Sequence, residues 1–129
     1  MKYYLPIIDA QNVYIEEIEI HHAKKFRVLD VLYENLNCSL VEKIPFDNKY
    51  DFIIDEEGLY KKHEFAYKIS NYPNEFKDHP FVGKSTLVKQ KITDEGIEWE
   101  LFKDYKELSE VLTNHFQEMK VYQIPNNLN

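Results

Sequence analysis

The sequence contains few of the residues that build several common kinds of functional site. Only three glycines occur among 129 residues, and they do not cluster, so the closely spaced glycines of Walker-type and dinucleotide-binding loops are missing. The single cysteine, Cys38, cannot form an internal disulfide, and no Cys/His set has the spacing of a structural zinc site. We therefore expect a fold that depends on its hydrophobic core alone and that belongs in a reducing compartment.

The chain also lacks long apolar runs and an excess of positive charge. No stretch approaches the roughly 18 apolar residues of a membrane span, and the N-terminal residues do not form a secretory signal. Lys and Arg number 16 against 23 Asp and Glu, which gives a net charge of -7. Because an acidic surface repels phosphate backbones, this balance disfavours a protein that coats duplex nucleic acid. We expect a cytoplasmic protein of a bacterial host cell, without membrane contact.

The residues that are present suit one folded domain. Hydrophobic residues make up 43% of the chain and aromatic residues 15%, which is close to the composition of globular proteins. A chain of 129 residues has room for one core of ordinary size. We assign residues 1–124 to a single α+β domain and residues 125–129 to a flexible polar tail.

Alternating hydrophobic residues predict a β-hairpin at the N-terminus. Its strands, residues 3–9 and 12–20, flank Ala10-Gln11, which leaves room only for a tight turn. Within the second strand the alternation changes phase across Glu16-Glu17, and we expect a β-bulge there. Further strands are predicted at residues 39–44, 50–55, 81–92 and 97–102, the last two as a second hairpin.

Two segments carry apolar residues at the three- and four-residue spacings of an amphipathic helix. The first is residues 22–37, and the second follows Asp104, an N-cap residue three positions before its expected partner Glu107. Residues 61–80 have weak periodicity and contain prolines, so we expect a long loop there. Hairpins with interspersed helices predict an α+β fold, an antiparallel sheet with two helices packed on one face. The helix residues expected to be buried are Phe26, Leu29, Leu32, Leu36, Leu108, Val111, Leu112 and Phe116.

Three segments that follow the first hairpin and helix resemble a known family. They are Val41-Glu42-Lys43-Ile44-Pro45-Phe46, Phe52-Ile53-Ile54-Asp55-Glu56-Glu57-Gly58-Leu59 and Phe81-Val82-Gly83-Lys84-Ser85-Thr86-Leu87-Val88. Over residues 7–92 the chain resembles small phage and mobile-element proteins of the domain-of-unknown-function 3846 type, with an acidic pair and glycine after a central strand. It departs from that family after the turn, where residues 61–65 replace a Leu-Pro-x-Asn segment. The resemblance implies a mobile-element origin and supplies no catalytic residues.

The reactive side chains do not form a recognisable catalytic or metal-binding motif. His21 and His22 are adjacent beyond the end of the second predicted strand, and adjacent side chains of an extended chain point to opposite faces, so the two cannot easily bind one ion. Glu75-Phe76-Lys77 has the Glu-x-Lys pattern of some metal-dependent nucleases, but it lies in a predicted loop. Serine and cysteine do not occur in a known nucleophile motif. We expect no catalytic residues, no bound metal and no cofactor.

Acidic residues and tyrosines alternate with the core residues of both predicted hairpins. The simplest interpretation is that they form a solvated face. If they share one face, however, they can recognise a basic protein surface by charge, with tyrosines as anchors. The residues that we predict to bind a partner are Tyr14, Glu16, Glu17, Glu98 and Glu100.

Two classes of function follow from these observations. The first, which we favour, is a non-enzymatic phage or mobile-element inhibitor or adaptor. Its partner would be a protein with a basic surface, for example a nucleic-acid-handling defence protein such as a CRISPR effector. An immunity protein that neutralises a toxin would recognise its partner in the same way, by binding a basic surface. The second class is a small-ligand or nucleotide-binding domain, acting as a sponge, with its pocket beneath residues 61–80.

Overall fold

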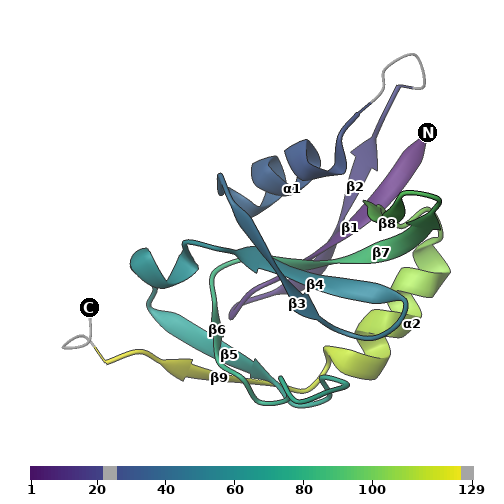
Figure 1. The fold of residues 1–129 in the computed structure, drawn as a ribbon. Coiled ribbons are helices and arrows are strands. Elements are labelled where there is room, and N and C mark those ends of the chain that lie inside the picture. The colour runs from purple at the N-terminus through teal and green to yellow at the C-terminus, as the bar shows by residue number, and fades with distance from the viewer. Residues whose placement is uncertain (22–25, 126–129) are drawn as a thin grey trace.

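The computed structural model describes residues 1–21 and 26–125, and its elements confirm the predicted α+β class (Figure 1). The predicted tail, apart from Pro125, and His22 lie outside the described residues. The elements are β1 (Lys2–Ile8), β2 (Val13–Glu19), α1 (Val28–Leu36), β3 (Val41–Pro45), β4 (Tyr50–Asp55), the 3-10 helix η1 (Gly58–Tyr60), β5 (Phe65–Ile69), β6 (Phe81–Val82), β7 (Ser85–Thr93), β8 (Gly96–Glu100), α2 (Tyr105–His115) and β9 (Met119–Gln123).

The strands form two antiparallel sheets. The larger sheet has the order β2-β1-β7-β4-β3, with β8 paired to the second half of β7, and the smaller sheet has the order β6-β5-β9. At its start, β7 lies beside β1 through the pair Ile8 and Ser85. Further along, β7 pairs with β8 instead, and Phe102 after β8 bridges to Tyr4 of β1. The chain that follows β8 therefore takes the place beside β1 that β7 leaves.

The two helices cover opposite faces of the larger sheet, whereas we expected both on one face (Figure 1). The pairs Ile7/Ile8, Phe52/Ile53 and Leu87/Val88 are each divided between two hydrophobic clusters, and adjacent strand residues point to opposite faces. Consecutive apolar residues in a strand indicate burial on both sides. The α1 cluster contains Leu5, Ile7, Val31, Leu32, Leu36, Ile53, Val88 and Leu101. The α2 cluster includes Ile8, Phe52, Tyr67, Leu87, Phe102, Leu108, Val111 and Phe116, and part of it comes from the smaller sheet.

The expected bulge in β2 is absent from the described ladder. The pairing with β1 runs without interruption from Lys2 opposite Glu19 to Ile8 opposite Val13. The phase change arises because Ile15 packs against the α2 cluster and Ile18 against the α1 cluster. A strand that contributes to two cores loses strict alternation without an inserted residue.

Residues 61–80 contain a core strand, so the prediction of a long loop there was wrong. Tyr67 of β5 is fully buried, and its hydroxyl lies 2.8 Å from Ser85 Oγ and donates to Gly83 O at 2.9 Å. The main partner of β5 is β9, which lies far along the chain and which the sequence also did not predict. The segment predicted as one strand over residues 81–92 is divided at Gly83, where a φ of 71° turns the chain from the smaller sheet into the larger one.

The second helix begins as predicted, but its capping differs. The Asp104 side chain accepts a hydrogen bond from Lys106 N at 2.9 Å, which confirms the N-cap. Glu107 instead accepts from Tyr50 Oη at 2.7 Å and from Lys89 Nζ at 2.9 Å, so it joins α2 to the sheet. Of the helix residues expected in the core, Leu32, Leu36, Leu108, Val111 and Phe116 are buried, while Phe26, Leu29 and Leu112 are only partly buried.

Asp51 is a carboxylate that is 3% exposed, on the α1 side of the sheet. It accepts hydrogen bonds from Trp99 Nε1 at 2.9 Å and from Gln90 Nε2 at 3.0 Å, and so joins β4, β7 and β8. We expect Asp51→Ala to lower the free energy of unfolding by about 1–3 kcal/mol, because it leaves two donors without an acceptor. Asp51→Asn keeps one acceptor oxygen and should cost less.

Urea unfolding followed by tryptophan emission measures this difference directly, since Trp99 is the only tryptophan. Equal losses of stability in the two variants would contradict the role assigned to the hydrogen bonds.

Candidate functional site

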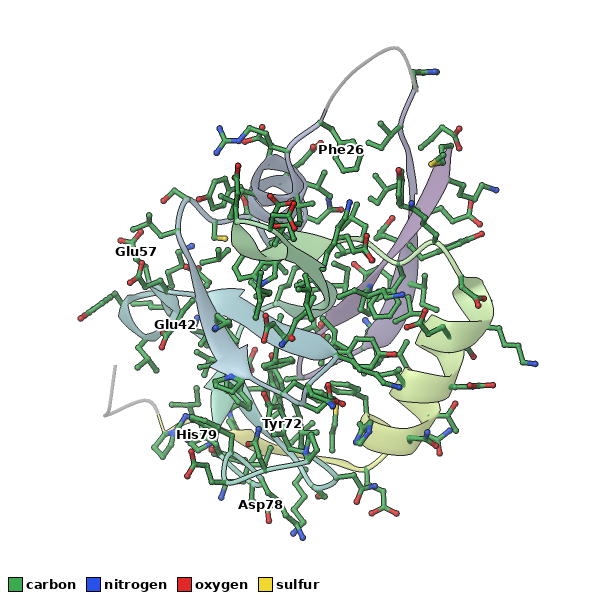
Figure 2. All side chains as sticks on the ribbon, turned by 45° about the vertical axis from the view of Figure 1, so that its right-hand side comes forward. Phe26, Glu42, Glu57, Tyr72, Asp78 and His79 are labelled. Carbon is green, nitrogen blue, oxygen red and sulfur yellow. The ribbon has the colours of Figure 1, made fainter. Side chains whose placement is uncertain are left out.

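The candidate site is a pocket of about 270 Å³ between the β3–β4 pair and the segment that leads into β6. Its walls combine four polar residues with an apolar floor. We call it the acidic pocket and define it by Glu42, Asp55, Glu56 and His79 together with Ile44, Ile54, Phe76 and Phe81. Figure 2 shows the labelled Glu42 and His79 on the same side of the molecule.

Strand register positions one wall of the acidic pocket. Glu42 of β3 lies directly across from Ile54 of β4, and Ile44 follows two residues later on the same face. The opposite wall comes from the segment before β6. There the His79 ring packs edge-on against Phe76 and Phe81, with ring centroids 5.7 and 5.1 Å away. Two segments that are distant in sequence therefore enclose one small apolar space with an acidic margin.

Asp55 is held by contacts within the protein. Its Oδ1 accepts from Glu57 N at 2.9 Å, and its Oδ2 lies 2.6 Å from Lys61 Nζ. The hydrogen bond to Asp55 raises the pKa of Lys61. Burial, followed by the charge of Asp55, raises the pKa of the nearby Cys38 thiol. The thiol therefore stays protonated at neutral pH and is a poor nucleophile.

Glu42 and Glu56 have no such partners. Both side chains are exposed, and neither makes a hydrogen bond or an ion pair with another described residue. Lys61, a cation beside this end of β4, already binds Asp55. Two carboxylates are thus available to an incoming cation above the apolar floor.

The acidic pocket does not form a metal centre. Within residues 1–21 and 26–125, no group of three or more His, Cys, Asp or Glu side chains is arranged to hold an ion. Two other histidines have structural contacts: His63 Nε2 lies 2.8 Å from Gly58 O, and His115 Nδ1 lies 2.8 Å from Asn71 O. What the acidic pocket can do chemically is bind a positively charged group.

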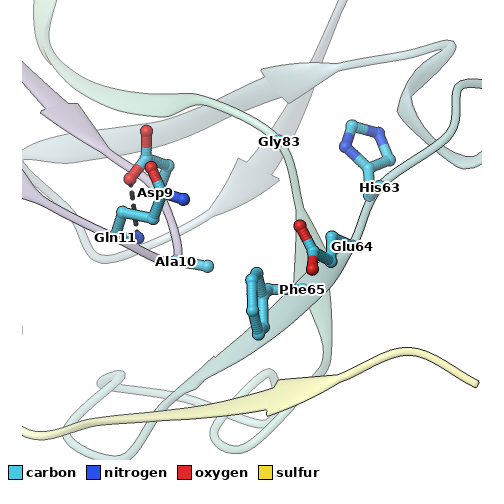
Figure 3. Close-up of a pocket in the computed structure, with 7 residues that line it drawn as sticks. All are labelled: Asp9, Ala10, Gln11, His63, Glu64, Phe65 and Gly83. Carbon is cyan, nitrogen blue, oxygen red and sulfur yellow. Dashed lines mark hydrogen bonds between the residues drawn. The ribbon is translucent and has the colours of Figure 1, made fainter.

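A smaller and more open pocket of about 170 Å³ lies between the β1–β2 turn and the start of β5 (Figure 3). Asp9 shapes the turn, because its Oδ1 accepts from the backbone N of Gln11 and Asn12, each at 2.8 Å. His63 on the other side is bound to Gly58. The side chains of Asp9 and His63 are therefore engaged in local structure, which makes this pocket a weaker candidate.

A groove of about 590 Å³ lies beside Trp99, where Phe26, Leu29 and Ile97 also line it. Ile97 is 63% exposed, and the Trp99 ring is fixed by its bond to Asp51. The surface is mainly apolar and lacks the paired carboxylates of the acidic pocket.

The structure divides the five predicted partner-binding residues between two faces. Tyr14 and Glu16 point to the same side as Ile18, which packs in the α1 cluster. Glu17 points to the other side. Glu98 and Glu100 also point to that other side, because Trp99 and Leu101 next to them pack in the α1 cluster. Glu17, Glu98 and Glu100 therefore share one face of the larger sheet. Tyr14 and Glu16 lie on the opposite face.

Lysines lie next to the three glutamates on the shared face. Lys91 and Lys89 stand directly across from Glu98 and Glu100 in the β7–β8 ladder. Lys2 Nζ lies 3.6 Å from Glu17 Oε2. Opposite charges across a ladder attract each other, so this face has a weaker negative field than its acidic residues alone suggest.

Sequence reasoning noticed the acidic end of β4 but missed Glu42 and His79 as part of a site. The alternation of Glu42 with Ile44 places the carboxylate on the core side of β3, and this pattern was visible in the sequence. His79 offered no such signal, because its place beside β3 depends on how the whole segment before β6 folds.

Comparisons of the chain with protein-family models, with curated proteins and with solved structures found no match. The resemblance to the domain-of-unknown-function 3846 type therefore stays a prediction. Among the described helices, none has the length and apolar character needed to cross a membrane.

Proposed function

We propose that this protein is a non-enzymatic inhibitor or adaptor that binds a basic protein partner, and that the acidic pocket receives a lysine or arginine side chain of that partner. The observation that carries this proposal is the pair of available carboxylates, Glu42 and Glu56, above an apolar floor in a pocket of about 270 Å³. Lysine and arginine have an apolar stem and a charged end. The floor suits the stem, and the carboxylates suit the charged end.

The charge of the acidic pocket favours a cation over a nucleotide. Three of its lining residues are Asp or Glu, and none is Lys or Arg. Proteins bind phosphates mainly through basic side chains and backbone N–H groups, so this lining repels a nucleotide. The volume also falls just below the roughly 300–1,000 Å³ of typical small-molecule sites. Phe76 and His79 belong to residues 61–80 and line the pocket, which supports the ligand-binding alternative, but the acidic lining fits a cationic side chain better.

The partner class follows from charge. Proteins that handle nucleic acids present clustered lysines and arginines, and a chain with net charge -7 is attracted to such surfaces over a distance. We therefore propose a mobile-element protein that acts in the cytoplasm of a bacterial host and binds a defence protein such as a CRISPR effector. A toxin-neutralising immunity protein would use the same pocket. Glu17, Glu98 and Glu100 are proposed as a separate and weaker contact surface.

We expect the double variant Glu42→Gln/Glu56→Gln to weaken the binding of N-acetyl-arginine amide to the protein. Loss of charge-assisted hydrogen bonds should cost about 1–2 kcal/mol, or roughly five- to thirtyfold in Kd. Titration followed by NMR chemical shifts measures this weak affinity. The matched control is Glu34→Gln/Glu110→Gln, which removes the same amount of charge at two exposed glutamates outside the acidic pocket and should leave the affinity nearly unchanged.

N-acetyl-citrulline amide, a neutral ligand of nearly the same shape, should bind much more weakly than the arginine compound. Equal effects of the two double variants would show that binding follows net charge and would refute the assignment of the acidic pocket. Equal affinity for the two ligands would refute recognition of a cation.

A further inference from the structure

The smaller sheet ends in β9, whose outer side has no neighbouring strand among the described residues. Four of its five residues are exposed, and Val121 and Tyr122 are 47% and 40% exposed. A strand edge with unpaired backbone groups and exposed apolar side chains can pair with another strand.

The ladder between β5 and β9 determines which backbone groups β9 presents at this edge. At one end of the ladder Ser70 N–H donates to Glu118 O at 3.0 Å, and at the other end Ile124 N–H donates to Glu64 O at 2.9 Å. In an antiparallel ladder, residues whose groups point toward the partner strand alternate with residues whose groups point away from it. Three residues of β9 therefore direct their N–H and C=O groups outward: Met119, Val121 and Gln123.

The two outer edges of the larger sheet are protected in ways that β9 is not. At the end of β3, Tyr72 Oη and Asn74 Nδ2 donate to Pro45 O at 2.8 and 2.7 Å, and Pro45 has no N–H of its own. The edge of β2 carries Glu17 and Glu19, which would repel the same strand of another copy. In contrast, β9 has no acidic residue.

We propose that β9 pairs with β9 of a second copy of this chain, antiparallel about a two-fold axis at Val121. In this register Met119 faces Gln123 of the second copy, and all outward-directed backbone groups of one strand meet those of the other. The two three-stranded sheets then become one continuous six-stranded sheet. The inference concerns a surface separate from the acidic pocket and goes beyond the proposed function.

The sequence of β9 favours both a second copy and this register, because each copy supplies both partners of a lysine–aromatic contact. Centring the axis on Val121 places Lys120 opposite Tyr122 of the second copy, a lysine–aromatic contact. The chain already makes such a contact internally, with Lys68 Nζ 5.5 Å from the centroid of the Tyr122 ring. Centring it on Lys120 would oppose two lysines, which is unfavourable. A groove of about 160 Å³ lies on the core side of the edge, between Val121 and the turn that joins β1 to β2.

The net charge gives this association a characteristic salt dependence. Two copies with a net charge of -7 each repel one another, so added salt should strengthen the dimer by screening the repulsion. Binding of a cation to the acidic pocket should instead weaken with salt. The two proposals therefore predict opposite trends and can fail independently.

Sedimentation equilibrium over a range of protein and salt concentrations tests the dimer. We expect a monomer–dimer equilibrium in the wild type and at least a tenfold weaker association for Val121→Pro. The Val121 N–H points outward, so proline there removes a donor at the open edge and spares the bonds to β5.

A charge exchange keeps the test informative if the proline variant does not fold. Tyr122→Lys should abolish the dimer by opposing two lysines, and Lys120→Glu/Tyr122→Lys should restore it by opposing glutamate and lysine. A wild type that stays monomeric at millimolar concentration would overturn the proposal. A dimer that none of these variants changes would overturn it as well.

Discussion

Leu108→Ala should lower the free energy of unfolding by about 2–5 kcal/mol, whereas Leu112→Ala, four residues later on α2, should cost clearly less. Leu108 is fully buried in the α2 cluster, and Leu112 only packs against its margin. The sequence pattern treats the two leucines as equivalent, and it predicts a cost of about 2–5 kcal/mol for Leu112→Ala. The structure assigns that cost to Leu108.

Urea denaturation of the two variants beside the wild type measures this difference, with equal m-values required for the comparison. If both variants shift the midpoint by the same amount, the two leucines contribute equally to the core and the assigned packing of α2 is incorrect.

Raising the pH above about 10 should destabilise the protein steeply, because three tyrosines resist ionisation in the folded state. Burial is the largest cause of the raised pKa at Tyr50, Tyr67 and Tyr72. At Tyr50 the hydrogen bond to Glu107 raises the pKa further, whereas at Tyr67 the bond to Ser85 acts in the opposite direction.

The sign follows from proton binding. In the unfolded chain tyrosine has a pKa near 10, and in the folded protein these three values are higher, so the folded state retains protons that the unfolded state releases. The resulting stability is fully present below about pH 10 and is lost above it. Each tyrosine should remove about 1.4 kcal/mol per pH unit, or about 4 kcal/mol per unit for the three together.

Urea denaturation at several pH values above 9, with phenolate absorbance recorded in parallel, tests this expectation. Tyr67→Phe should reduce the slope by about one third, although the lost hydrogen bonds make the variant less stable at neutral pH. Ionisation of all the tyrosines before any loss of structure would contradict the burial of these three side chains.

Local patterns predicted the elements whose partners are close in sequence. The hairpin of β1 and β2 appears where alternation indicated it, β4 where β-branched and aromatic residues indicated it, and α2 begins after the N-cap Asp104. The pairing of β5 with β9 could not be predicted in this way, because β6, β7, β8 and α2 separate the two strands in sequence. Likewise, the division of α1 and α2 between two faces depends on which apolar residue of each strand meets which helix.

The candidate site was predictable only in part for the same reason. The sequence shows the acidic cluster at the end of β4, with Asp55 and Glu56, and it suggests a pocket beneath residues 61–80. It does not show that Lys61 forms an ion pair with Asp55, nor that His79 lines the wall of the acidic pocket opposite β3 and β4. These facts arise from tertiary contacts, and they decide which carboxylates remain available to a partner.

The most direct test of the proposed function is the position of a bound cationic ligand. Intermolecular nuclear Overhauser effects should connect the methylene protons of N-acetyl-arginine amide with the side chains of Ile44, Ile54 and Phe81, and the His79 resonances should shift in the same titration. Contacts of the ligand with the groove beside Trp99 instead, or shifts that do not saturate, would contradict the assignment of the acidic pocket as the binding site.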